Sequence, residues 1–161
     1  MLVCAFVLSK LDYFNSLLSG GPLYILRRLQ KVQNSAAKLV FKSRKRDHVQ
    51  PLLQALYWLP LPARIDYKLS TICHNFISDS SPAYLSDLLT VYKPPRQLRS
   101  SVDTLTLRTL RVQTTTFGRR SFSYSASKQW NSLPSDIPHI QSSRAFKTAL
   151  KIDLFKQHYN N

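Results

Sequence analysis

Basic side chains are the groups in this sequence best placed to do chemistry, because many of them gather in one short stretch. Twenty residues without an acidic side chain hold eight cations: Arg27, Arg28, Lys31, Lys38, Lys42, Arg44, Lys45 and Arg46. Guanidinium and ammonium groups bind phosphate oxygens, and neutralising several phosphates of one strand releases condensed counterions. Like charges at this density repel one another unless a polyanion neutralises them. The stretch therefore favours a nucleic-acid contact over a merely solvated helix face.

A second basic group is interleaved with aromatic residues. Its cations are Lys93, Arg96, Arg99, Arg108, Arg111, Arg119 and Arg120, and the aromatic residues among them are Tyr92, Phe117, Phe122 and Tyr124. Such a mixture suits phosphate contact combined with base stacking. The same rings also suit a hydrophobic core, so both interpretations stay open. We include Arg119 and Arg120 with the first group as candidate nucleic-acid-binding residues.

Patterns for catalysis or metal binding are weak. The eight aspartates never occur as Asp-Asp or Asp-x-Asp and there is no glutamate, whereas two-metal phosphoryl transfer needs converging carboxylates. Three glycines form no phosphate-cradling loop, and Cys73 and His74 point in different directions on a helix. We expect no catalytic residue, metal site or cofactor in this chain, and no small-molecule substrate.

The overall charge points to the same class of partner. Twenty-three lysines and arginines against eight aspartates give a net charge of +15 over 161 residues. The apolar run at residues 2–8 is far shorter than the roughly 20 residues of a membrane helix, so we expect no membrane contact. Two distant cysteines fit a reducing compartment, and "KSRKR" resembles a nuclear localisation patch. The expected location is intracellular, in the nucleus or in a cytoplasmic ribonucleoprotein.

A helix is expected to position most of these cations. The apolar periodicity that indicates it is clearest over residues 23–42. At 100° per residue its apolar side chains fall in an arc of about 140°, and its cations fall in a separate arc of about 100°. One side is therefore predicted to pack and the other to be uniformly positive. The residues predicted to pack are Ile25, Leu26, Leu29, Val32, Ala36, Leu39 and Val40.

The stretch "WLPLPAR" could form part of a ligand pocket or a connector between two helices. Asp47 is the expected N-cap of a helix that runs towards Trp58, and Pro60 disfavours helical geometry at Leu59. Pro62 suits the first turn of the next helix, which extends to about Ile77. The spacing predicts a connector between helices.

The remaining pattern predicts a mostly α-helical fold with a looser middle. Helices are expected over residues 1–19, 82–89 and 119–130, and Ser143 is the expected cap of a final helix. Residues 104–112 alternate as a short strand would. The expected organisation is a helical part at 1–90, a basic proline-containing loop or strand region at 91–117, and a helical part at 118–161, within one structural unit.

Several segments together resemble one family in their order and spacing. They are "SKLDYFNSLLSG", "LRRLQKVQNSAAKLV", "DHVQPLLQALYWLPLPARIDYK", "SPAYLSDLL", "LRSS", "FGRRSFSYSASKQWNSLP" and "FKTALK". The chain is similar, over residues 5–155, to the carboxy-terminal thumb and post-thumb region of reverse transcriptases of jockey-like, LINE-type non-LTR retrotransposons. Phe14 stands where the family commonly has Cys.

The resemblance implies a helical, thumb-like bundle that grips the template–primer duplex. The palm, with its Asp-Asp motif and the Mg²⁺ that the parent RNA-directed DNA polymerase uses, is absent, so Met1 is expected to begin inside the parental reading frame. The leading hypothesis is a non-catalytic fragment whose partner is RNA or an RNA–DNA hybrid. The alternatives are a packing segment that docks on the missing palm through the apolar edge of residues 2–18, a remnant open reading frame and, least favoured, an autonomous polymerase.

Overall fold

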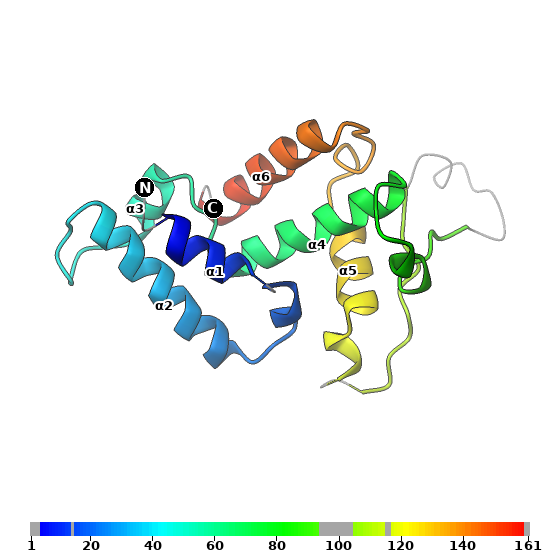
Figure 1. Cartoon of the computed structure of the whole chain (residues 1–161), viewed down its shortest axis with the longest axis horizontal. Helices are drawn as coiled ribbons and strands as arrows, with labels where there is room; N and C mark the ends of the chain where they lie inside the picture. Colours follow the sequence, from blue (N-terminus) through cyan, green and yellow to red (C-terminus); the bar gives the residue numbers. More distant parts are fainter. Residues whose placement is uncertain (1–3, 14, 94–104, 115–116, 160–161) are drawn as a thin grey trace. The chain divides into compact units, whose positions relative to one another are not determined.

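The computed structural model describes residues 4–13, 15–93, 105–114 and 117–159 and confirms a mostly helical fold (Figure 1). The principal helices are α2 (Leu23–Val40), α3 (Gln50–Ala55), α4 (Leu61–Ile77), α5 (Phe122–Asn131) and α6 (Ser143–Tyr159). Shorter helical turns are a π-helical turn at Cys4–Leu8 that leads into α1 (Ser9–Asp12), and 3₁₀ turns at Asn15–Leu18, Ala83–Asp87 and Gly118–Arg120. Over the described residues there is no strand, and Leu107, within the segment expected to be one, makes a single antiparallel bridge with Val91.

The chain forms two compact units. The first comprises Met1–Asp66 and Lys151–Asn161, and the second comprises Tyr67–Leu150. The unit boundaries fall inside α4 and α6 and not at residues 90 or 117, where the composition changes. The three-part organisation expected from the sequence stays a prediction.

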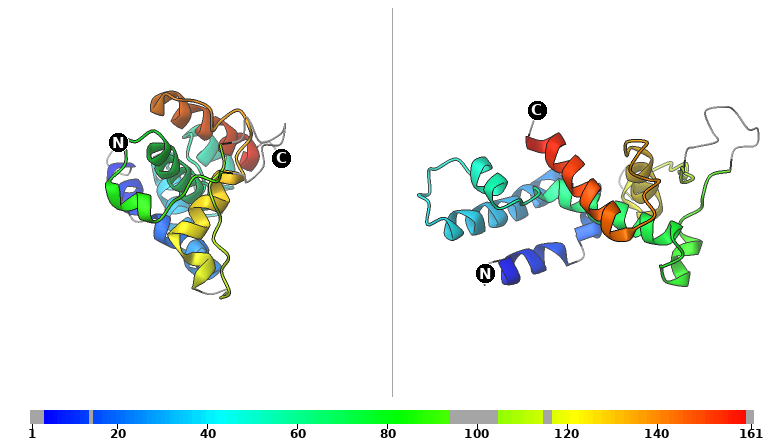
Figure 2. Two further views of the ribbon diagram at one scale, coloured as in Figure 1. Left: turned by 90° about the vertical axis from the view of Figure 1, so that its right-hand side faces the viewer. Right: turned by 90° about the horizontal axis from the view of Figure 1, so that it is seen from above.

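Small side chains allow close packing at the core of the first unit. Ala36 and Ala37 of α2 are buried against Leu53 and Trp58, with Tyr159 packed beside them. The amino-terminal turns lie alongside α2, as two views show (Figures 1 and 2). This core fixes α2 by one side and leaves its other side open.

The buried side of α2 differs from the predicted one. Gln33 is fully buried, whereas Leu39 is 66% exposed and Val32 is 49% exposed. At 100° per residue, these two lie about 100–120° from Gln33, at the edge of the packing side. The prediction that Val32, Leu39 and Val40 pack was therefore wrong. Burial of Gln33 follows from a long-range hydrogen bond, which a pattern of apolar residues does not reveal.

The connector between α3 and α4 is held by side chains from outside it. The Gln33 amide donates to the Leu59 carbonyl at 2.8 Å, and the Tyr159 hydroxyl donates to the Trp58 carbonyl at 2.7 Å. The Leu61 amide donates to the Gln30 side-chain oxygen at 2.7 Å. Since a buried backbone group without a partner costs about 1–3 kcal/mol, these bonds make the turn tolerable. The prediction of a connector between helices is confirmed.

A stack of aromatic rings forms the centre of the second unit. Phe146 of α6 stacks on His74 of α4 with ring centroids 4.1 Å apart, and on Trp130 of α5 at 5.8 Å. The His74 Nε2–H donates to the Ile140 carbonyl at 2.7 Å. The buried Cys73 thiol faces the Ala126 carbonyl at 3.6 Å. These contacts assign Cys73 and His74 to packing.

Two predicted caps are corrected by the hydrogen bonds. The Asp47 carboxylate accepts the Arg44 amide at 2.7 Å, and no side chain caps α3, whose N-cap residue is Val49. The side-chain oxygen that faces the first turn of α6 belongs to Ser142, at 3.5 Å from the Ala145 amide. Local spacing alone did not select the residue at either helix start, because aspartate and serine side chains can bond to several nearby backbone amides.

Candidate nucleic-acid interface

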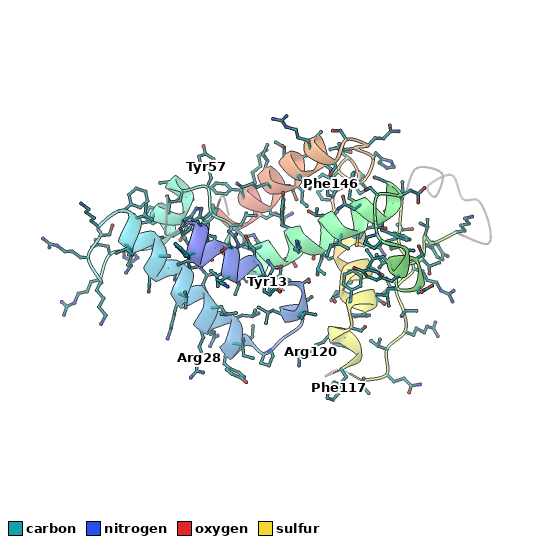
Figure 3. The ribbon with its side chains drawn as sticks, viewed as in Figure 1. Tyr13, Arg28, Tyr57, Phe117, Arg120 and Phe146 are labelled. Carbon is teal, nitrogen blue, oxygen red and sulfur yellow. The ribbon has the colours of Figure 1, made fainter. Side chains whose placement is uncertain are left out.

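The exposed side of α2 carries the first cations of the predicted site. Arg27, Arg28 and Lys31 are exposed, within little more than one helical turn. On a helical projection they lie 120–160° from the buried Gln33, on the side of the helix away from it. Figure 3 shows the Arg28 side chain directed away from the ribbon of α2. The segregation expected for these three cations is present in the structure.

A tight turn after α2 carries the remaining cations of this group. Lys42 adopts a left-handed conformation with φ of 51°, and the Ser43 amide donates to the Lys38 carbonyl at 3.0 Å. The Lys38 ammonium donates to the Lys45 carbonyl at 2.6 Å, which ties the turn to the last part of α2. Lys42, Arg44, Lys45 and Arg46 remain exposed. Lys38 is half-buried, so its charge is partly used to hold this turn.

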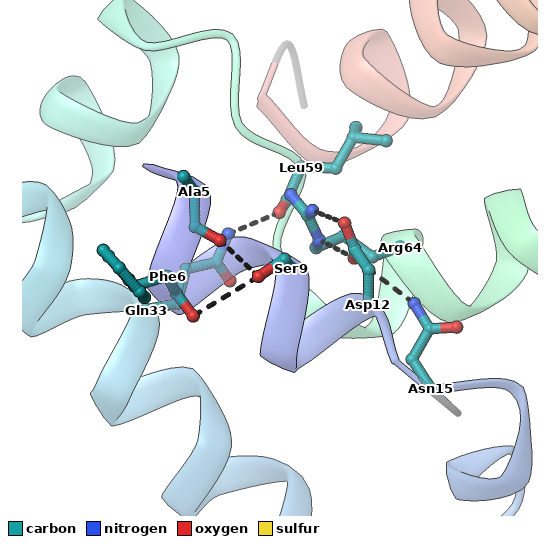
Figure 4. A network of polar contacts seen from close by, with 8 residues as sticks. All are labelled: Ala5, Phe6, Ser9, Asp12, Asn15, Gln33, Leu59 and Arg64. Atoms are coloured by element: carbon teal, nitrogen blue, oxygen red, sulfur yellow. Dashed lines mark hydrogen bonds and ion pairs between the residues drawn. The ribbon is translucent and has the colours of Figure 1, made fainter. Parts of the chain in front are cut away.

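Aspartates do not neutralise this cationic surface. Among the described residues the one ion pair is bidentate and joins Arg64 of α4 to Asp12 of α1, so it uses none of the cations of α2 and its turn (Figure 4). The nearby Asp47 carboxylate accepts a backbone amide and pairs with no described cation. The charges of α2 and its turn are therefore free to act together on a polyanion.

An apolar groove borders the cationic side of α2, and the sequence pattern missed it. A cavity of about 570 Å³ lies between Phe6 and Val7 on one side and Val32, Ala36 and Leu39 on the other. Phe6 is 68% exposed. The edge position of Val32 and Leu39 on the helical projection was the available signal.

Arg119 and Arg120 belong to the second unit, whereas the cations of α2 and its turn belong to the first. Both are exposed in the 3₁₀ turn Gly118–Arg120, after Phe117, which is 81% exposed (Figure 3). Phe122 and Tyr124 are half-buried, whereas Tyr92 is 46% exposed. The aromatic group thus divides between core and surface. Arg96 and Arg99 lie outside the described residues.

Groups that could support catalysis are few. Burial raises the pKa of the Cys73 thiol to about 12, which keeps it protonated and unreactive near neutral pH. No cluster of histidine, cysteine and carboxylate side chains in the described ranges is suited to a metal ion. Within the same ranges, no helix has the length and apolar character needed to cross a bilayer.

Comparisons with family models, with curated proteins and with solved structures found no match to this chain.

Proposed function

We propose that this chain is a non-catalytic module that binds RNA or an RNA–DNA hybrid through the basic surface of α2 and its following turn. The observation that carries the proposal is an exposed run of cations, unpaired with any described aspartate, on one side of a helix whose other side is packed. We name Arg27, Arg28, Lys31, Lys42, Arg44, Lys45 and Arg46 as the phosphate-binding set, with Lys38 holding the turn.

The dimensions of α2 suit contact with several phosphates. From Arg27 to Val40, the last residue of α2, the helix rises by roughly 20 Å, at about 1.5 Å per residue. A duplex presents one phosphate charge per about 1.7 Å of its axis, so engagement of about six phosphates is reasonable. Contacts of this kind position a duplex without reading its sequence, so sequence-independent binding is expected.

The sequence resemblance supports the same function. In the non-LTR reverse transcriptases that the chain resembles, the thumb grips the template–primer duplex while the palm performs Mg²⁺-dependent polymerisation. In this proposal the chain binds the duplex and does not polymerise. Its place of action would be the nucleus or a cytoplasmic ribonucleoprotein, where such duplexes occur.

A second candidate function is favoured by exposed apolar side chains. Phe6 and Leu17 are each 68% exposed, and Phe6 lines the groove beside α2. A segment that packs on a polymerase palm would expose such a surface when alone. Sedimentation and thermal melting of the purified chain discriminate between the two, because a monomer with one cooperative transition counts against the packing segment.

The proposed function is tested by matched charge removal. Arg27, Arg28 and Lys31 are changed together to Gln, and the control changes the exposed Arg144, Lys147 and Lys151 of α6, so that both variants lose three charges. A blunt-ended RNA–DNA hybrid is titrated with each variant. We expect the α2 variant to bind at least tenfold more weakly than the control, whatever the hybrid sequence. Equal losses in the two variants would contradict the assignment to α2.

A further inference from the structure

A second cavity, within the second unit, combines an aromatic ring with two guanidinium groups. Its volume is about 550 Å³, and it is lined by Tyr92, Thr106, Arg108, Thr109, Arg111 and Asn131 among others. We call it the Tyr92 notch. Its size falls in the range of about 300–1,000 Å³ typical of ligand sites.

The antiparallel bridge between Val91 and Leu107 brings the ring and one guanidinium to the same face. The Tyr92 amide donates to the Thr106 carbonyl at 2.9 Å, and the Arg108 amide donates to the Thr90 carbonyl at 2.8 Å. Tyr92 and Arg108 are each one residue from the bridge, and alternation places them together as diagonal neighbours. The two side chains are therefore within reach of one bound group.

The floor of the notch is fixed from behind by α5. The Asn131 amide donates to the Leu107 carbonyl at 2.8 Å, and its oxygen accepts the Leu107 amide at 2.9 Å. The Trp130 indole donates to the Leu105 carbonyl at 2.7 Å, and Leu107 is only 1% exposed. Preorganised backbone of this kind lowers the conformational cost of binding a ligand.

The exposed ring and the two guanidinium groups of the notch indicate which kind of ligand it binds. Tyr92 is 46% exposed, and neither Arg108 nor Arg111 forms an ion pair with a described carboxylate. A tyrosine ring offers a stacking surface to an unpaired base, and guanidinium groups bind the adjoining phosphates in bidentate geometry. A duplex cannot use the ring in this way, because its bases are already stacked on one another.

We propose that the Tyr92 notch binds single-stranded nucleic acid, with one base stacked on Tyr92 and the flanking phosphates held by Arg108 and Arg111. The inference deepens the proposed nucleic-acid-binding function by naming a strand-specific site on the second unit. It assigns the ring and the two arginines, and it leaves the Asn131 amide to its bonds with Leu107.

The test uses the whole chain and a short fluorescent single-stranded oligouridylate in low salt. Tyr92→Ala is expected to weaken binding about tenfold, and Tyr92→Phe, which keeps the ring, should stay within about twofold of the original chain. Changing Arg108 and Arg111 to Gln should reduce the salt slope by about 1.4, while the control pair Arg144 and Lys147 leaves it nearly unchanged. Far-ultraviolet circular dichroism checks that each variant is folded.

Photocrosslinking adds a readout that does not depend on affinity. A 5-iodouridine in the single strand should crosslink to Tyr92, as located by mass spectrometry of the peptides. No binding of the single strand, or equal affinity for Tyr92→Ala and the original chain, overturns the inference. A blunt hybrid distinguishes the two proposals, because Tyr92→Ala should bind it normally and the α2 variant should not.

Discussion

The side-chain amide of Gln33 donates a hydrogen bond of 2.8 Å to the carbonyl oxygen of Leu59, 26 residues further along the chain (Figure 4). This bond links the centre of α2 to the connector before α4. Together with the bond from Leu61 to Gln30, it fixes the rotation of α2 about its axis. Because Gln33 faces inwards, Arg27, Arg28 and Lys31 face outwards. The exposure of the cations thus depends on a buried polar contact.

The first prediction concerns this contact. Gln33→Leu fills a similar volume but leaves the Leu59 carbonyl without its donor, so we expect a loss of about 1–3 kcal/mol in the free energy of unfolding. Urea denaturation measures it. The same change at Gln50, which is exposed at the start of α3, serves as control and should alter stability by less than about 0.5 kcal/mol. Similar losses at the two positions would show that the bond is unimportant.

A second prediction separates stability from binding at Lys42. Its φ of 51° is strained for a residue with a side chain, and glycine adopts it freely. Lys42→Gly should therefore raise the melting temperature by about 1–3 °C and reduce the salt slope for a hybrid by about 1. Lys42→Gln removes the same charge without relieving the backbone. It should weaken binding equally and leave the melting temperature unchanged or lower, and a rise for Lys42→Gln would contradict the argument from strain.

The third prediction is a pH dependence that arises from Asp66. Burial raises the pKa of this carboxyl to about 6, and the smaller attraction of His158 acts in the opposite direction. Between about pH 4 and pH 6 the folded state keeps a proton that the unfolded state has released, so stability falls as pH rises through this range. Above about pH 6 the charged carboxylate costs on the order of 3 kcal/mol.

Asp66→Asn removes this cost. Relative to the original chain, we expect its melting temperature to be nearly equal below about pH 4 and higher by about 6–12 °C at neutral pH. Differential scanning calorimetry at both pH values gives the comparison. Asp87→Asn, at an exposed position, should show no such divergence. If Asp66→Asn differs from the original chain by the same amount at both pH values, Asp66 is not the source.

Local spacing was sufficient for much of the fold. Helix α4 begins at Leu61, just after Pro60, as the prolines predicted, and Leu69 and Cys73, one helical turn apart on it, are both buried. Local spacing failed where a distant partner decides the outcome. Gln33 is buried because of a carbonyl far along the chain, which no helical projection contains.

The same division applies to the candidate interface. The exposure of Arg27, Arg28 and Lys31 followed from the helical projection. The bond from the Lys38 ammonium to Lys45 did not, because it depends on how the turn folds back. The Tyr92 notch could not be predicted from the sequence either, because Tyr92 and Arg108 are brought together only by the bridge from Val91 to Leu107.

Glycine scarcity explains one feature of the helix ends. Two residues after the end of each of α2, α3 and α4 stands a non-glycine residue at positive φ. These residues are Lys42, Tyr57 and Asp79. In each case the following amide bonds back to a carbonyl five residues earlier, as from Trp58 to Leu53. With three glycines in 161 residues, other residues must take this conformation. The backbone strain at Lys42 can therefore be recognised only from the structure, which shows where the helix ends.

The most direct test of the central claim is the salt dependence of binding to a blunt-ended RNA–DNA hybrid. If the surface of α2 and its turn engages about six phosphates, the slope of log affinity against log salt should be about −5. Affinity should then fall about a thousandfold between roughly 50 and 200 mM salt. A flat response, or no binding at the lower salt concentration, would contradict the claim that these cations bind a phosphate backbone.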